Sequence, residues 1–152
     1  MNDILVSIQD FIPQDRLLYC PDPEMGERLF YLKSPSYTQP TYQVSTNDPI
    51  VFELKHDGTL IGMECLLPRV TWHVLGNTIQ PSEGSYARLI FSEETILQSN
   101  FDIYADILAH TSYTYAYILL GSIEPGIQWI YLSKDCIALI KDDRLKGFYI
   151  FL

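Results

Sequence analysis

The stretch FELKHDGTLIGMECLL, from Phe52 to Leu67, constrains the fold more than any other part of the sequence. Two apolar runs flank the turn KHDG at residues 55–58. Asp-Gly supplies the positive φ angles that a tight hairpin requires, so the stretch predicts two antiparallel strands folded back on each other. A chain built around such a hairpin is expected to form a β-sheet.

A weaker copy of this hairpin ends the chain, in the stretch IALIKDDRLKGFYIFL from Ile137 to Leu152. The second turn is one residue shorter than the first. The matching pairs are Lys55 and Lys141, Asp57 and Asp143, Leu60 and Leu145, and Gly62 and Gly147. This pattern is architectural and says little about chemistry.

The likeness continues upstream of both hairpins. Residues 29–34 (LFYLKS) align with residues 117–122 (YILLGS), and Ser45 and Ser133 each lie 11 residues after the serine that ends the aligned segment. We interpret the pattern as an internal duplication. A chance alignment of two β-rich segments is the alternative.

The duplicated units cover about 15–67 and 99–152, and residues 68–98 connect them. Two similar sheets are then expected to pack around an approximate two-fold axis, because each hides the apolar face of the other. The length of 152 residues fits a single compact domain over residues 1–152. Aromatic residues make up 13 % of the chain, including 11 Tyr and 7 Phe, which favours a mostly β fold.

Local patterns predict most elements as strands, with one or two short helices. Ser92, followed by Glu93 and Glu94, has the N-cap and acidic first turn of a helix that ends near Asn100. The N-terminal segment, residues 4–12, has apolar residues at helical spacing and predicts a short helix, although alternation at positions 4, 6 and 8 leaves a strand as the alternative. Strands are expected at 17–20, 28–33, 41–45, 50–54, from 60 onward, in an alternating run at 70–77, and at 86–91, 101–107, 113–120, 127–132, 136–140 and 145–152.

The chain is acidic, with a net charge of −9. No cluster of Lys and Arg is present to neutralise phosphates, so nucleic acid and anionic membranes are disfavoured as partners. Such a charge is common in soluble proteins, but it also suits rapid docking of a basic protein. Three cysteines without a CxxC pair, no secretory start and no run of 18 apolar residues favour a cytoplasmic location without a membrane span.

Glu64 is the most interesting single residue, because Tyr149 stands at its position in the second hairpin. It is a candidate general base, or a carboxylate at a sheet edge paired with Arg69 or Lys55. His73 is a second weak catalytic candidate, and a small-molecule or hydrolytic site between the units would use Glu64, His73 and Tyr149. Ligand spacings typical of metal sites are absent, so we expect no metal and no cofactor.

Alternation places Tyr113, Tyr115 and Tyr117 on one face of a strand. An exposed row of this kind is a good binding surface, because tyrosine offers a large rigid ring and a polar tip. A row buried with its hydroxyls at the rim would be part of the core instead. The sequence leaves both interpretations open.

Parts of the chain resemble a group of short bacterial domains that form a family of unknown function. The family pattern is Tyr-Asp-Pro-Glu, then a Leu-Tyr-Ile-like strand, then Asp-Gly-x-Leu-x-Gly-Ile-Glu. The matching residues here are Tyr19, Asp22, Pro23 and Glu24, then 29–32, then 57–64. The chain departs from the family where Glu27-Arg28 replace the usual Asp, and where a second unit follows. The family has no settled activity to transfer, so the resemblance implies a small sheet and nothing catalytic.

The absence of catalytic motifs, the acidity and the tyrosines favour a binding protein over an enzyme. The concrete hypothesis is a bacterial protein that neutralises a basic partner, as immunity proteins do for nuclease toxins. Its candidate docking charges are Asp22, Glu24, Glu27, Glu93 and Glu94. A homodimer joined through exposed strands is a further alternative.

Overall fold

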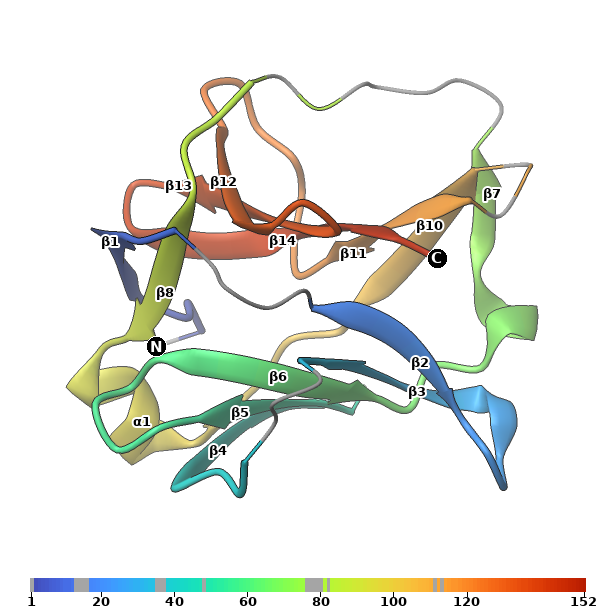
Figure 1. Cartoon of the computed structure of the whole chain (residues 1–152), viewed down its shortest axis with the longest axis horizontal. Helices are drawn as coiled ribbons and strands as arrows, with labels where there is room; N and C mark the ends of the chain where they lie inside the picture. The colour runs from blue at the N-terminus through green and yellow to red at the C-terminus, as the bar shows by residue number, and fades with distance from the viewer. Residues whose placement is uncertain are drawn as a thin grey trace.

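Two six-stranded sheets form most of the protein, as Figure 1 shows. The computed structural model describes residues 2–12, 17–34, 38–47, 49–75, 81, 83–110, 112 and 114–152. The prediction of a mostly β chain with antiparallel sheets and a short helix is confirmed. In the described residues, no helix is long and apolar enough to cross a membrane.

The first sheet, the lower layer in Figure 1, contains the central hairpin. Its neighbouring strands are antiparallel, except that β9 runs parallel to β4. Its order is β2 (Leu18–Asp22), β3 (Gly26–Lys33), β6 (Leu60–Cys65), β5 (Ile50–Leu54), β4 (Tyr42–Thr46) and β9 (Asn100–Phe101).

The second sheet, the upper layer, contains the C-terminal hairpin. It too is antiparallel apart from one edge pair, β7 with β10. Its order is β12 (Gln128–Ser133), β13 (Cys136–Lys141), β14 (Arg144–Phe151), β11 (Tyr115–Leu119), β10 (Asp106–His110) and β7 (His73–Leu75).

Five strands of each sheet follow the same path. The order β2-β3-β6-β5-β4 repeats as β10-β11-β14-β13-β12, so both sheets consist of a hairpin joined to a three-stranded meander. Both central hairpins also carry a bulge at the same place, where Gly62 lies opposite Glu53 and Gly147 lies opposite Leu139. The predicted match of the two glycines therefore agrees with the register of the strands.

The upstream part of the sequence alignment needs a correction. Tyr31 pairs with Glu64, and Tyr117 pairs with Tyr149, so Tyr31 corresponds to Tyr117 rather than to Leu119. The alignment of Ser45 with Ser133 is shifted in the same direction, by two residues. A shift of two keeps every side chain on its own face of the strand, which is why the apolar pattern did not expose it.

A two-stranded ribbon closes one end of the sandwich. It pairs β1 (Val6–Asp10) with β8 (Ala87–Phe91), at the left of Figure 1. The predicted N-terminal helix is therefore wrong, and the alternating strand pattern was the correct one. Ile4 and Val6 are buried, because pairing with β8 turns one side of this segment toward the core.

The ribbon is bonded to the turns of both central hairpins. The Phe91 N–H donates to the Gly58 carbonyl, and the Val6 N–H donates to the Asp143 carbonyl, each at 2.9 Å. Gly58 and Asp143 each lie two residues before equivalent leucines, Leu60 and Leu145. The two hydrogen bonds are therefore equivalent as well. The β1 strand, which leads into the first sheet, thus holds the turn of the second sheet, and β8 holds the turn of the first.

The inner faces of the sheets meet around phenylalanines. The Phe52 ring lies 6.0 Å from that of Phe148 in the opposite sheet and 5.4 Å from that of Phe91 in the ribbon. All three side chains are buried. Burial of each such ring contributes about 1.5–3 kcal/mol, so the contact ties the three pieces together.

The helix predicted after Ser92 is confirmed as α1 (Glu93–Gln98). The predicted strand at 101–107 is broken, because β9 ends in the first sheet and β10 begins in the second. The alternating run at 70–77 begins instead with a 3-10 turn, Arg69–Thr71, before β7. Both differences arise where the chain passes from one sheet to the other.

We expect Gly58→Ala to destabilise the fold by about 1–3 kcal/mol more than Gly126→Ala. Both glycines have φ +87°, so the cost of that backbone angle is shared. A Cβ at Gly58 would lie 2.7 Å from the Phe91 carbonyl oxygen, whereas at Gly126 its nearest atom, Lys141 Nζ, is 3.9 Å away. Equilibrium urea unfolding measures the difference, and equal losses would contradict close contact between ribbon and turn.

Thr95→Val should remove about 1–3 kcal/mol of stability, because it leaves a backbone donor of the ribbon segment unsatisfied. The buried Thr95 hydroxyl accepts a hydrogen bond from the Leu5 N–H at 3.0 Å. Leu97→Ala on the same helix is the control, since Leu97 is 77 % exposed. Thermal unfolding of the two variants checks this. A Thr95→Val protein as stable as the control would show that α1 does not anchor the ribbon.

Candidate functional site

The outer faces of the two sheets differ sharply in chemistry. Glu64 and Glu53 on the first sheet occupy the positions of Tyr149 and Leu139 on the second. The backbone register is the same, so the fold itself does not require carboxylates there. The acids on the outer face of the first sheet are therefore a property of its side chains and are not imposed by the backbone arrangement.

Glu64 lies in the interior of the first sheet. Its strand, β6, runs between β3 and β5, and Glu64 is directly opposite Tyr31 on one side and Val51 on the other. The predicted position at a sheet edge is therefore wrong. The ion pairs described for this chain do not connect Glu64 to Arg69 or Lys55.

Asp22 supports the turn between β2 and β3. Its Oδ1 accepts hydrogen bonds from the backbone N–H groups of Met25 at 2.8 Å and Glu24 at 2.9 Å, and these donors hold its pKa below the ordinary value. Its Oδ2 accepts a hydrogen bond from the Tyr31 hydroxyl at 3.1 Å. Asp22 thus links the turn to the outer face of the sheet.

The Tyr31 hydroxyl is bonded to one carboxylate and lies in the field of two others. Burial raises the pKa of Tyr31, and its hydrogen bond to Asp22 and the negative charges of Glu64, Asp22 and Glu53 raise it further. The Lys33 ammonium lies over the Tyr31 ring, 4.1 Å from its centroid. We call Asp22, Glu53 and Glu64 around Tyr31 the carboxylate cluster.

Glu53 is the residue of this cluster that the sequence did not single out. Glu53 is only 4 % exposed, and its Oε2 has no hydrogen-bond partner among the described residues. A buried carboxylate oxygen without a donor carries a desolvation cost that the fold does not compensate. The only available signal was its outward position in β5, between the inward Phe52 and Leu54.

Aromatic rings cover the outer face of the second sheet, centred on Tyr149. The Tyr149 ring centroid lies 5.0 Å from that of Tyr117, 5.1 Å from Tyr115, 5.3 Å from Phe151 and 6.4 Å from Trp129. Tyr117 and Tyr149 are buried beneath their neighbours, whereas Tyr115 is half-buried. Tyr117 therefore belongs to a buried core, which is one of the two interpretations of the tyrosine row. Tyr113 lies outside the described residues.

Burial raises the pKa of Tyr117 to about 12, and the neighbouring Tyr115 adds to the shift. Burial raises the pKa of Tyr149 in the same direction. The neutral phenol is therefore favoured in the folded state. This face is a packed apolar layer and offers no ready proton donor at neutral pH.

His73 pairs with Asp106 at the far edge of the second sheet. The Nε2 to Oδ1 distance is 3.8 Å, and the two side chains are 67 % and 69 % exposed. Glu64 and Tyr149 point outward from sheets that face each other through the core, so the core separates them. The structure therefore does not bring Glu64, His73 and Tyr149 together in a site between the two sheets.

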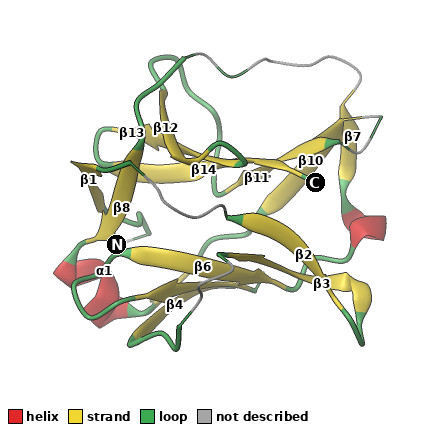
Figure 2. Ribbon diagram, viewed as in Figure 1, coloured by secondary structure: helices red, strands yellow, loops and turns green. Residues whose placement is uncertain are grey.

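The predicted docking charges do not form one patch either. Glu93 and Glu94 stand in the first turn of α1, where they suit the helix N-terminus. Asp22 and Glu24 lie at the β2–β3 turn, at the other end of the first sheet in Figure 2. The side chain of Glu27 lies outside the described part of the protein.

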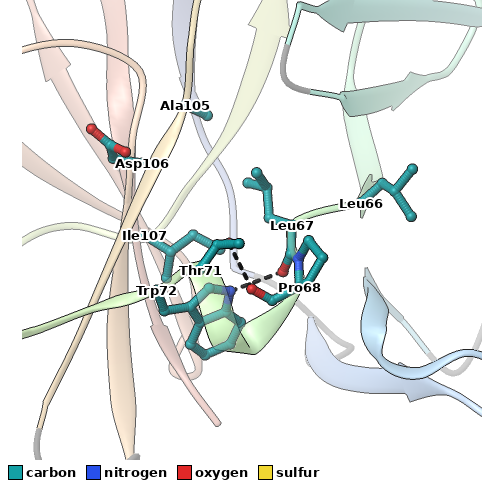
Figure 3. Close-up of a pocket in the computed structure, with 8 residues that line it drawn as sticks. All are labelled: Leu66, Leu67, Pro68, Thr71, Trp72, Ala105, Asp106 and Ile107. Carbon is teal, nitrogen blue, oxygen red and sulfur yellow. Dashed lines mark hydrogen bonds between the residues drawn. The ribbon is translucent and has the colours of Figure 1, made fainter.

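A hollow of about 260 Å³ lies beside the 3-10 turn. Figure 3 shows the residues that line it. The Trp72 indole N–H donates to the Leu67 carbonyl at 2.9 Å, and the Thr71 hydroxyl donates to the Pro68 carbonyl at 2.7 Å. Among the described residues that line it, Asp106 is the one that carries a charge. The Thr71 hydroxyl and the Trp72 indole N–H are thus occupied by nearby backbone carbonyls.

Within the described residues, no group of three or more His, Cys, Asp and Glu side chains could hold a metal ion. Cys65 and Cys136 are buried, and burial raises the pKa of Cys136 to about 12, so neither resembles an activated thiol. Compared with models of known protein families and with curated proteins, the chain matches none. The carboxylate cluster is the arrangement that the fold explains least.

Tyr117→Phe should remove an ionisation near pH 12 from the absorbance titration at 295 nm. The folded-state pKa of about 12 lies above the unfolded value of about 10, so the neutral phenol stabilises the fold below about pH 10. That contribution is lost as the pH rises toward 12. Tyr104→Phe, at a 69 % exposed ring, is the control and should leave this part of the curve unchanged. A difference titration completed near pH 10 would show that Tyr117 is not buried.

Proposed function

We propose that this chain is a non-catalytic cytoplasmic binding protein that captures a basic protein partner, in the way that immunity proteins neutralise toxins. The observation that carries the proposal is the carboxylate cluster on the outer face of the first sheet. Glu53 and Glu64 stand where the second sheet has Leu139 and Tyr149. These acids add no apolar packing, and a bound cation would compensate their charge.

The charge of the whole chain supports the same function. A net charge of −9 attracts a basic partner over a longer distance than any single contact, and it raises the association rate at low salt. Salt screens this attraction, with a Debye length of about 8 Å at physiological ionic strength. Binding through the cluster should therefore be fast and sensitive to salt.

The central place of Glu64 suits an interface better than the rim charges do. Charges at the rim of an interface mainly change the association rate, whereas a half-buried charge that is fully paired in the complex changes the dissociation rate. Glu93 and Glu94 are exposed at the helix end and belong to the first class. Glu64 lies in mid-sheet beside Tyr31 and belongs to the second.

Glu64→Gln should weaken capture of the partner by about tenfold or more, because it leaves the partner's cation unpaired. The measurement is co-purification of a basic protein from the native host at increasing salt, followed by dissociation kinetics with each variant. Glu94→Gln removes the same charge at the other end of the sheet and is the matched control. Capture that resists high salt, or that responds to Glu94→Gln alone, would count against this proposal.

A further inference from the structure

A cation is already held at the carboxylate cluster. The Lys33 ammonium lies 4.1 Å from the centroid of the Tyr31 ring, in cation–π contact. The same Tyr31 hydroxyl donates to Asp22 and lies within the field of Glu64 and Glu53. The protein thus places a positive group from its own chain over a ring that lies in the field of three acids.

Glu53 supplies the second, independent observation. Its Oε2 is buried and has no hydrogen-bond partner in the part of the chain that the structure describes, so Lys33 does not donate to it. The strand register places Gly62 between Lys33 on β3 and Glu53 on β5, and glycine adds no side chain between the two. When the flexible Lys33 side chain moves aside, a donor group gains access to the Glu53 carboxylate.

Arginine fits this arrangement better than lysine does. A guanidinium is planar, stacks on an aromatic face and offers five N–H donors in a fixed fork. Tyr31 provides the face, and Glu64 on the neighbouring strand β6 and Glu53 on the next strand β5 provide carboxylate acceptors to one side of it. An ammonium has three donors and no plane to stack, so it satisfies fewer of these groups.

We infer that the outer face of the first sheet is an arginine-binding site, in which a guanidinium from a protein partner displaces Lys33 from Tyr31 and binds Glu53 and Glu64. This inference rests on the proposed function, because it names the side chain by which the basic partner is held. Lys33 is then a built-in competitor that occupies the site until the partner arrives.

The test uses two probe peptides, acetyl-Gly-Arg-Gly-amide and acetyl-Gly-Lys-Gly-amide, titrated into the full chain. Backbone amide shifts of Tyr31, Gly62 and Glu64 report binding by nuclear magnetic resonance. We expect the arginine peptide to shift these amides and to bind about tenfold more tightly than the lysine peptide. Equal affinities, or shifts confined to other surfaces, would overturn the inference.

Two substitutions are expected to change the arginine affinity in opposite directions. Lys33→Met removes the competing ammonium and should tighten binding, whereas Glu53→Gln should weaken it by about tenfold or more. Glu94→Gln, at the helix end, should leave it unchanged. A gain in affinity cannot result from a loss of folding. Unchanged or weaker binding of the arginine peptide to the Lys33→Met variant would therefore overturn the proposal that the guanidinium displaces Lys33.

Two further comparisons separate the possible failures. Free L-arginine should bind more weakly than the peptide, because its own carboxylate meets the acids of the cluster; tighter binding would overturn a protein source for the guanidinium. Capture of a basic partner that is unaffected by excess arginine peptide would refute the arginine site and leave the proposed function standing. Binding of the arginine peptide without capture of any partner would support the arginine site and refute the proposed function.

Discussion

The hydrogen bonds between the ribbon and the two hairpin turns are the constraint on which the rest of the structure depends. The ribbon is bonded to one turn of each sheet, through Val6 to Asp143 in the second sheet and through Phe91 to Gly58 in the first. The phenylalanines between the sheets then pack beneath this closure. Neither sheet can leave the ribbon without exposing its apolar face, so the two halves should unfold as one cooperative unit.

This closure also explains how far the sequence could predict the fold. The hairpins and the glycines at the bulges are local signals, so they were readable in the sequence. The apolar residues of the N-terminal segment fit both the spacing of a helix and the alternation of a strand. The segment forms a strand because it pairs with β8, which is distant in the sequence. The sequence could not reveal the shift of the repeat by two residues. A shift of two leaves each side chain, including those of Tyr31 and Tyr117, on the same face of its strand.

The site was predicted less well, because burial and proximity come from the tertiary structure. Glu64 stood out through its contrast with Tyr149, which is a comparison within the sequence. Glu53 did not, because an outward acid in a strand is usually exposed, and its 4 % exposure arises only in the folded sheet. The acids at the β2–β3 turn and in α1 were chosen by charge alone, and turn and helix geometry account for Asp22 and Glu93.

The two outer faces show what one backbone can support with different side chains. Tyr117 and Tyr31 are equivalent, yet Tyr117 lies among Tyr115, Trp129 and Tyr149, whereas Tyr31 lies among carboxylates. The aromatic face gains stability from its own packing. The acidic face instead brings like charges together and buries an oxygen without a donor, which opposes folding. The proposed arginine site accounts for this contrast, because a positive group from a partner would compensate the charge of Glu53 and Glu64.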